Sequence, residues 1–346
     1  MFSLKVIVSI GLVLLLFQQV DIARMLGVIS VDLIPALLLA ALVLLIQSFG
    51  IGYRWHALLS TLGLMKDLGW ALKRSFIATF FNQCLPSSIG GDGYRMIAAR
   101  RAGLDWQPAV SCVLVERYTA LVCLIIVAAL GLIPLLMALT ETSLIWLFIG
   151  FVIAGFAGAF LVASLAEIAA FQKLPGIISR LLNAWIVGRI FADMRRVIRS
   201  RRLLLILGGA GLVNNAANGV ALWIIGNALG IELGLGPYMT IIAMATLITV
   251  IPISFAGWGL RDGVIVLLLG AVGVAQAEAL IISISFGMAL LISSIPGGVM
   301  LWRSVDIERI DETTAKADIV TDLENETGAA VTSEAPVAAE KRAPDT

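Results

Sequence analysis

Apolar segments of membrane-spanning length recur along this chain. A transmembrane helix needs about 20 mostly apolar residues. The stretches that meet or approach this length are 3–20, 33–53, 109–138, 144–165, 203–229 and 279–302. Only 14% of the 346 residues are charged, whereas soluble domains carry about 25% charged residues. The sequence therefore predicts an all-α polytopic membrane protein with a full transmembrane helix at each of these six stretches.

Two further apolar segments, 75–94 and 238–276, are each interrupted by the same motif. The first copy, at 84–95, reads C-L-P-S-S-I-G-G-D-G-Y-R, and the second, at 251–261, reads I-P-I-S-F-A-G-W-G-L-R. A shift of 166 residues aligns them as P-x-S-x-[GA]-G-x-G-x-R. Proline removes a backbone donor and glycine permits turns. Because non-helical backbone survives at membrane depth only where protein or water satisfies it, each copy marks either a polar cavity or a tightly packed hairpin tip.

Lysine and arginine gather in some of the loops, and cytoplasmic loops carry an excess of these residues. Loops 54–74, 95–101 and 173–202 are rich in them, whereas loops 139–143 and 230–237 contain none. We therefore predict that the first three are cytoplasmic and the other two external. The N-terminal segment lacks a small-x-small cleavage site, so we expect it to remain as the first span, with both termini in the cytoplasm.

This orientation makes the two interrupted segments re-entrant. Because basic loops flank 75–94 on both sides, that segment must enter the membrane and return to the cytoplasmic side, and 238–276 then forms a second hairpin that opens outside. Two units of opposite orientation that carry the same motif form an inverted repeat, in which binding sites lie at broken helices near the repeat interface. The alternative is eight full spans, with both motif segments crossing the membrane.

Two segments outside the spans have a distinctive composition. Residues 171–202 carry arginine every three to four positions among apolar residues. This is typical either of an amphipathic helix in the cytoplasmic headgroup layer or of an ordinary cytoplasmic loop. Residues 303–346 hold 11 acidic and 5 basic side chains and have no apolar period. We predict a transmembrane domain over 1–302, followed by a disordered acidic cytoplasmic tail.

The repeated motif supplies groups that bind phosphate. Exposed backbone N–H groups at a helix break, with an arginine nearby, favour a phosphate site, and intramembrane charge is costly enough to indicate function. The candidate substrate-binding residues within the two copies are Arg95, Arg261, Ser88, Ser254, Gly91, Gly93, Gly257 and Gly259. The alternative for the four glycines is close helix packing alone.

Five polar residues near the motif complete the candidate substrate-binding set. Asp92 is a proton or cation site, a local partner of the motif arginine, or a hairpin-tip carboxylate at the cytoplasmic boundary. Glu116 and Arg117 are adjacent in one span, so they face different directions and each must find its own partner or water. Arg117 can extend its side chain to the interface, which makes Glu116 the stronger functional candidate. Asp262 follows the second motif arginine, and Asn82 precedes the first motif.

Histidine and cysteine are scarce. His56 is the single histidine, which argues against a histidine-based metal site and against Ser–His or Cys–His catalysis. The three cysteines lie in apolar context without metal-ligand or disulfide spacing. We therefore predict no metal site, no cofactor and no nucleic-acid partner.

The segments N-Q-C-L-P-S-S-I-G-G-D-G-Y-R, V-E-R-Y-T-A-L and P-I-S-F-A-G-W-G-L-R-D-G occur in this order. Together they resemble the lysylphosphatidylglycerol synthase transmembrane family, which includes UPF-type inner-membrane proteins, and the resemblance covers residues 1–302. It implies a bacterial or archaeal inner-membrane protein of the lipid-flippase type. The chain departs from the two-domain synthases because a short acidic tail follows where those enzymes carry an aminoacyltransferase domain. It also has Asp262 where Glu is expected in many relatives, and Ala256 where Gly is usual.

These features predict a lipid flippase or transporter that moves a phospholipid or a polyprenyl-phosphate-linked lipid across the inner membrane. Its partners would be membrane lipids that are anionic or carry phosphate. One alternative is a membrane-embedded transferase on lipid-linked substrates, with Asp92, Glu116 and Asp262 as candidate acids or bases. Another is a membrane partner that recruits a soluble lipid-modifying synthase through its tail. Because the aminoacyltransferase domain is not expected here, transport is favoured over catalysis.

Overall fold

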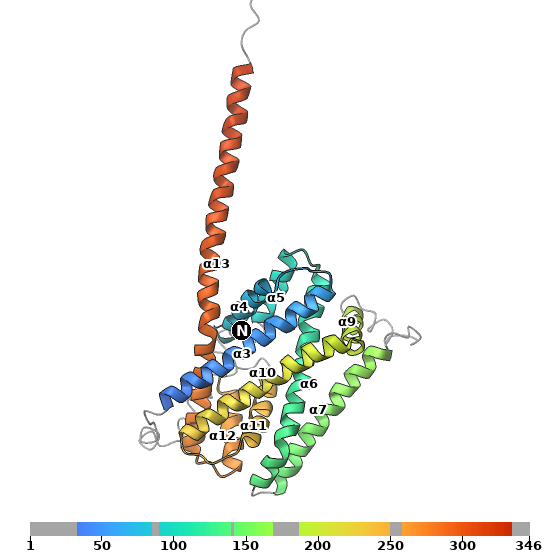
Figure 1. The fold of residues 1–346 in the computed structure, drawn as a ribbon, viewed down its shortest axis with the longest axis vertical. Coiled ribbons are helices and arrows are strands. Elements are labelled where there is room, and N and C mark those ends of the chain that lie inside the picture. The colour runs from blue at the N-terminus through green and yellow to red at the C-terminus, as the bar shows by residue number, and fades with distance from the viewer. Residues whose placement is uncertain (1–32, 85–89, 140–141, 169–186, 250–257, 334–346) are drawn as a thin grey trace, which may run out of the picture. The chain divides into compact units, whose positions relative to one another are not determined.

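The computed structural model describes residues 33–84, 90–139, 142–168, 187–249 and 258–333. Throughout these ranges every regular element is an α-helix (Figure 1). The helices are α3 (Leu33–Thr61), α4 (Leu68–Cys84), α5 (Gly90–Arg101), α6 (Trp106–Ala138), α7 (Thr142–Ile168), α9 (Val187–Arg199), α10 (Arg201–Ala228), α11 (Leu235–Ile248), α12 (Leu260–Ala271) and α13 (Gln276–Ser333). The all-α prediction is confirmed for this part of the chain.

Five helical segments within the described ranges are long and apolar enough to cross a membrane. They are α3, α6, Ile145–Leu165 of α7, α10 and Gln276–Ser304 of α13. They coincide with five of the six predicted spans, and the remaining one, 3–20, lies outside the described residues. The chain is therefore a multi-pass membrane protein. The predicted end of the second span at residue 53 falls inside α3, which continues to Thr61.

The two motif segments each form a pair of short helices. The first pair is α4, with 17 residues, and α5, with 12. The second pair is α11, with 14 residues, and α12, with 12. None of the four reaches the length of about 20 residues that a crossing helix needs. The connections between the members of each pair, at 85–89 and 250–257, lie outside the described residues.

The helices form two series of matching lengths. Each series runs from a long helix through two short helices to a second long helix. Adding 166 to the bounds of α3, α4, α5 and α6 gives 199–227, 234–250, 256–267 and 272–304. The observed bounds of α10, α11, α12 and the apolar part of α13 lie within four residues of these values. The repeat seen in the motif therefore extends to the helices around it.

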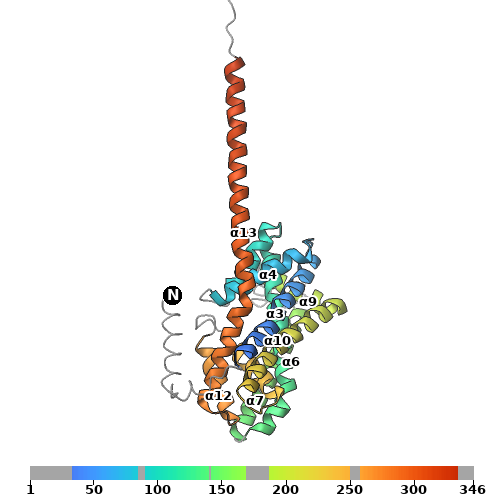
Figure 2. The ribbon, with the colours of Figure 1, turned by 60° about the vertical axis from the view of Figure 1, so that its left-hand side comes forward.

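Helices α3 and α10, the first members of the two series, pack side by side in opposite directions (Figures 1 and 2). The Gln47 amide donates to Asn218 Oδ1 at 2.5 Å. A β-carbon placed on Gly50 would lie 2.0 Å from Asn214 Oδ1, so a larger residue there would force the Asn214 side chain to move. Residue numbers rise along α3 while they fall along α10, and the pair is therefore antiparallel.

Glycines also bring helices of different series together. A β-carbon on Gly131 of α6 would lie 2.2 Å from the backbone oxygen of Gly236 in α11. A β-carbon on Gly297 of α13 would lie 2.0 Å from the backbone oxygen of Phe76 in α4. Gly131 and Gly297 are themselves 166 positions apart. The last long helix of each series thus packs closely against the first short helix of the other, which small residues permit in membrane proteins.

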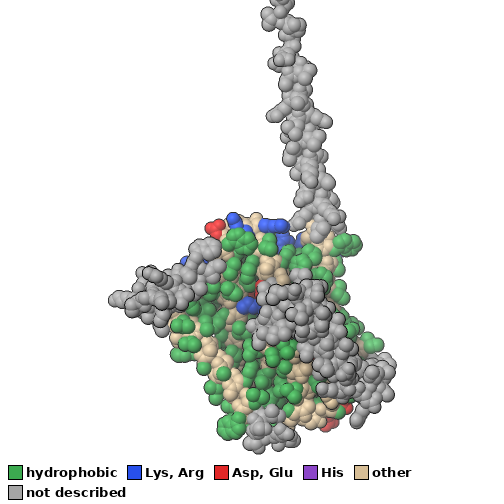
Figure 3. All heavy atoms as spheres, turned by 180° about the vertical axis from the view of Figure 1, so that it is seen from behind, with side chains coloured by type: hydrophobic (Ala, Val, Ile, Leu, Met, Phe, Trp, Pro, Cys, Tyr) green, Lys and Arg blue, Asp and Glu red, His purple; other side chains and the backbone are tan. Residues whose placement is uncertain are grey.

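The chain forms two compact units, residues 1–298 and 299–346. On the face of the first unit shown in Figure 3, apolar side chains cover the middle and Lys and Arg side chains gather at one end. Leu130, Phe160 and Leu205 are among its large exposed apolar residues, as expected for surfaces that face lipid. In the second unit α13 continues to Ser333, and the predicted disorder of the tail 303–346 stays a prediction.

Candidate functional site

The first motif arginine lies in α5, the helix that begins directly after the first break. Asp92 and Arg95 are one turn apart and share a face of this helix. Arg95 Nη2 donates to Asp92 Oδ1 at 2.6 Å, and Arg95 Nη1 donates to Glu116 Oε2 of α6. The three residues are only 4–5% exposed. Arg95 is therefore a buried cation shared between two carboxylates, and its guanidinium also lies 5.8 Å from the ring centre of Trp55.

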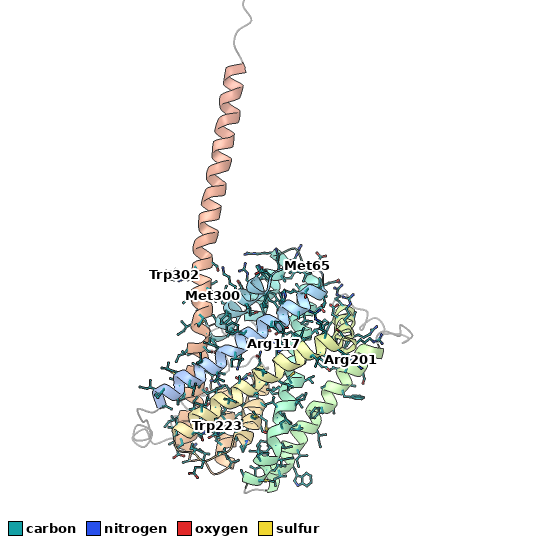
Figure 4. The ribbon with its side chains drawn as sticks, viewed as in Figure 1. Met65, Arg117, Arg201, Trp223, Met300 and Trp302 are labelled. Carbon is teal, nitrogen blue, oxygen red and sulfur yellow. The ribbon has the colours of Figure 1, made fainter. Side chains whose placement is uncertain are left out.

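Arg117 extends the same network. Its Nε donates to Asp92 Oδ2 at 2.6 Å, and its side chain is 44% exposed. In Figure 4, Arg117 lies lower in the view than Met65, which belongs to the loop after α3. The adjacent residues Glu116 and Arg117 therefore bind different partners, as predicted from their spacing. Three roles were possible for Asp92, and in the structure it is the local partner of Arg95.

Arg54 is a third arginine at this network, and the sequence reasoning missed it. The sequence predicts a basic loop that begins at residue 54, but Arg54 lies within α3 and is only 2% exposed. Its Nη2 donates to the backbone oxygen of Glu116 at 2.7 Å and to Thr119 Oγ1 at 2.8 Å. The helix simply continues past the apolar run that marked the span. The available signal was the apolar periodicity after Arg54, which places Ala57 and Leu58 in the core.

Asn82 and the two glycines of the first motif have different surroundings. Asn82 Oδ1 accepts a hydrogen bond from the backbone N–H of Gly91 at 2.9 Å, which joins the end of α4 to the start of α5. A β-carbon on Gly91 would lie 2.1 Å from the backbone oxygen of Ala78, whereas one on Gly93 would meet nothing within 4 Å. Gly91 therefore serves close helix packing, and Gly93 lies in open space.

The second motif arginine, in α12, is paired with its neighbour. Arg261 donates from Nε and Nη2 to Asp262 Oδ1 at 3.2 and 3.0 Å. Ser283 of α13 donates to the same oxygen at 2.7 Å. Asp262 Oδ2 accepts from the backbone N–H of Gly259, which has a φ of +83°. Because residues other than glycine adopt such a φ only at a cost, Gly259 fits the turn that starts α12.

Aromatic rings surround the guanidinium of Arg261. Its central carbon lies 5.4 Å from the ring centre of Trp258 and 5.5 Å from that of Phe286. Trp258 occupies the position that Asp92 has in the first copy. The first copy therefore holds its arginine between two carboxylates and beside one aromatic ring, whereas the second uses one carboxylate and two aromatic faces. The two copies are chemically unequal.

Both motif arginines are occupied by carboxylates in this structure. A phosphate group offers oxygens that bind a guanidinium in the same forked geometry as a carboxylate. A phosphate ligand would therefore bind by displacing a carboxylate oxygen rather than by approaching a free cation. Three residues predicted for this site, Ser88, Ser254 and Gly257, lie outside the described residues.

Half of the predicted amphipathic segment 171–202 is described. Residues 171–186 lie outside the described ranges, α9 covers 187–199, and Arg201 and Arg202 begin α10. Met194 and Val197 of α9 are buried in a core with residues of α3, α6 and α10. Asp193 of α9 accepts a hydrogen bond from Ser111 of α6 at 2.7 Å, which joins the two helices. It also accepts hydrogen bonds within α9 from Arg189 at 2.8 Å and from Arg196 at 3.2 Å. The apolar face of α9 therefore packs on protein.

Across the described ranges, no group of three or more His, Cys, Asp or Glu side chains could hold a metal ion. The model of one protein family matches residues 2–298, and its description is "Lysylphosphatidylglycerol synthase TM region". A search of curated protein sequences found no match. The family match covers all the charged and aromatic residues described at the two motif copies.

Proposed function

The chain belongs to the lysylphosphatidylglycerol synthase TM region family, and on this premise we propose that it is a flippase or transporter for a phosphate-bearing lipid. The lipid would be a phospholipid or a polyprenyl-phosphate-linked lipid of the inner membrane. Its phosphate would bind at the motif arginines while its acyl chains remain in the bilayer. Both chain termini would lie in the cytoplasm, with α4–α5 and α11–α12 as re-entrant hairpins that open on opposite sides.

The observation that carries this proposal is a buried arginine in each of two matching helix series. Arg95 and Arg261 are 4% and 5% exposed and lie in the helices that follow the breaks. Buried charge of this kind is costly, and in membrane proteins it marks substrate pathways. The doubled occurrence favours a role shared by both series over two unrelated structural ion pairs.

The antiparallel contact of α3 and α10 supports an inverted repeat. These helices are equivalent under the 166-residue shift and run in opposite directions. In transporters built from such repeats, substrate binds near broken helices and the repeats rock against each other. Rocking of the two series would expose the arginines to each side of the membrane in turn.

The ion pairs that the carboxylates form favour transport over the transferase alternative. A general acid or base must reach a proton on the substrate. Asp92 and Glu116 are both bonded to Arg95, and Asp262 is bonded to Arg261. Carboxylates held in ion pairs suit the role of counter-charges for arginines that bind and release an anion.

Translocation of a labelled lipid by the reconstituted protein tests the proposal. The full chain in phosphatidylcholine vesicles would be given fluorescent phosphatidylglycerol, and dithionite quenching would report lipid that reaches the outer leaflet. We expect Arg95→Ala and Arg261→Ala each to slow translocation about tenfold or more, because a desolvated charged contact is lost. The exposed Lys66 provides the control variant Lys66→Ala. Wild-type rates in both arginine variants, with folding intact by size exclusion, would contradict the proposal.

A further inference from the structure

Arg54 is a buried cation without a carboxylate partner in the part of the chain that the structure describes. Arg95 forms ion pairs with the carboxylates of Asp92 and Glu116, and Arg117 forms one with Asp92. The acceptors of Arg54 Nη2 are a backbone oxygen and a hydroxyl, and its Nε has no acceptor among the described residues. A buried charge that is held in no direct ion pair is unfavourable, so the burial of Arg54 without such a pair calls for an explanation.

The guanidinium of Arg54 lies directly beside Glu116. The oxygen that it binds at 2.7 Å is the backbone carbonyl of Glu116 itself. The carboxylate of the same residue is bonded to Arg95. One arginine therefore holds the backbone oxygen of Glu116 while another holds its carboxylate, so the two cations flank a single residue.

Arg54 also lies where three helices meet. It belongs to α3 and bonds to α6, and a β-carbon on Gly211 of α10 would be 3.6 Å from its Nη1. Helix α10 belongs to the second series and packs antiparallel to α3. Arg54 therefore lies at the contact between the two series.

We propose that Arg54 is the reserve counter-charge of Glu116, which takes over the Glu116 carboxylate when a ligand phosphate displaces it from Arg95. This inference rests on the proposed function. Without Arg54, displacement would leave a buried carboxylate unpaired, which is strongly unfavourable. With Arg54, one ion pair is exchanged for another and the ligand phosphate takes the place of Glu116 at Arg95. Arg54 is thus a positioning residue that does not touch the lipid.

A double-mutant cycle on Arg54 and Glu116 tests the exchange. Binding of fluorescent phosphatidylglycerol would be measured on the full chain in phosphatidylcholine nanodiscs. We expect Arg54→Gln to weaken binding by about 5- to 150-fold, the usual range of coupling between sites. Glu116→Gln removes the carboxylate that needs a second partner, so in its background Arg54→Gln should have no further effect. A purely structural role of Arg54 predicts the same loss in both backgrounds, and that result would overturn the inference.

Two additional measurements keep the test decisive. If Arg54→Gln does not fold, Arg54→Met enters the same cycle, because methionine removes the charge while its flexible, unbranched side chain fills the space. A loss that Glu116→Gln abolishes supports the exchange, and an additive loss overturns it. Lys66→Gln is the control and should bind like the wild type.

Inorganic phosphate as a second ligand separates this inference from the proposed function. If Arg54→Gln weakens the binding of inorganic phosphate, Glu116→Gln abolishes that loss, and the lipid does not bind, then the exchange stands and the lipid function fails. If the wild type binds the lipid but the cycle is additive, only the exchange fails. If the wild type binds neither ligand, both fail, because no anion then displaces Glu116.

Discussion

Asp92 joins two arginines that come from different helices. One of its oxygens binds Arg95 of α5 and the other binds Arg117 of α6. Glu116 binds Arg95 from the other side, so the network closes between α5 and α6. Removing one partner of a buried ion pair leaves an uncompensated charge, which costs more than the pair itself contributes. The stability of this region should therefore depend on single carboxylates.

Replacing Asp92 with asparagine should destabilise the protein. Asp92→Asn keeps the size of the side chain but removes one of the two carboxylates bonded to Arg95 and the carboxylate bonded to Arg117. We expect the free energy of unfolding to fall by about 3 kcal/mol, as for other broken buried pairs. Unfolding of the purified protein by SDS in detergent micelles would measure the change. The exposed carboxylate of Glu232 provides the control Glu232→Gln, which should change the value by less than about 0.5 kcal/mol. Equal values for the two variants would contradict this role of Asp92.

At the level of helices, the break in each motif segment produces two short helices that must pack against each other. Helices α4 and α5 are in contact through the Asn82–Gly91 hydrogen bond and the close approach of Gly91 to Ala78. The last long helix of each series adds a glycine contact to a short helix of the other series. Glycine is used in these places because the neighbouring backbone occupies the space of a side chain.

The two glycines of the first motif should respond differently to alanine. At Gly91 the new methyl group would lie 2.1 Å from a backbone oxygen, so α4 and α5 must separate. We expect Gly91→Ala to lower the free energy of unfolding by about 1–3 kcal/mol, the usual cost of overpacking. Gly93→Ala is the matched control, because open space surrounds it in the same helix and alanine favours helix by about 1 kcal/mol. A larger loss at Gly93 than at Gly91 would show that the packing of α5 differs from the structure.

For the whole molecule, the arrangement of two matching series implies a topology. Lys66 lies between α3 and α4, and Glu232 lies between α10 and α11. The two residues are 166 positions apart, and both are exposed. An inverted repeat places them on opposite sides of the membrane, whereas eight full spans place them on the same side.

Cysteine labelling from each side distinguishes the two topologies. Lys66→Cys and Glu232→Cys would be made in a chain in which Cys84, Cys112 and Cys123 are replaced. With a membrane-impermeant maleimide on right-side-out vesicles, we expect Glu232→Cys to react and Lys66→Cys to react only after permeabilisation. This follows from the positive charge of the loop that holds Lys66. Labelling of both positions from one side would exclude the inverted repeat.

The membrane class, five of the spans and the repeated motif could all be predicted from the sequence. These features depend on segment length, hydropathy and local backbone chemistry, which neighbouring residues alone decide. The sequence also showed that Glu116 and Arg117 need separate partners, since adjacent residues on a helix diverge.

The partners of the buried charges could not be predicted in this way, because they depend on how the helices pack. The pairing of Arg95 with Glu116 and of Asp262 with Ser283 each spans 21 residues and depends on how two helices rotate against each other. No local periodicity encodes that rotation. The burial of Arg54 was missed for the same reason, because a basic residue past an apolar run looks like a loop until α6 and α10 cover it.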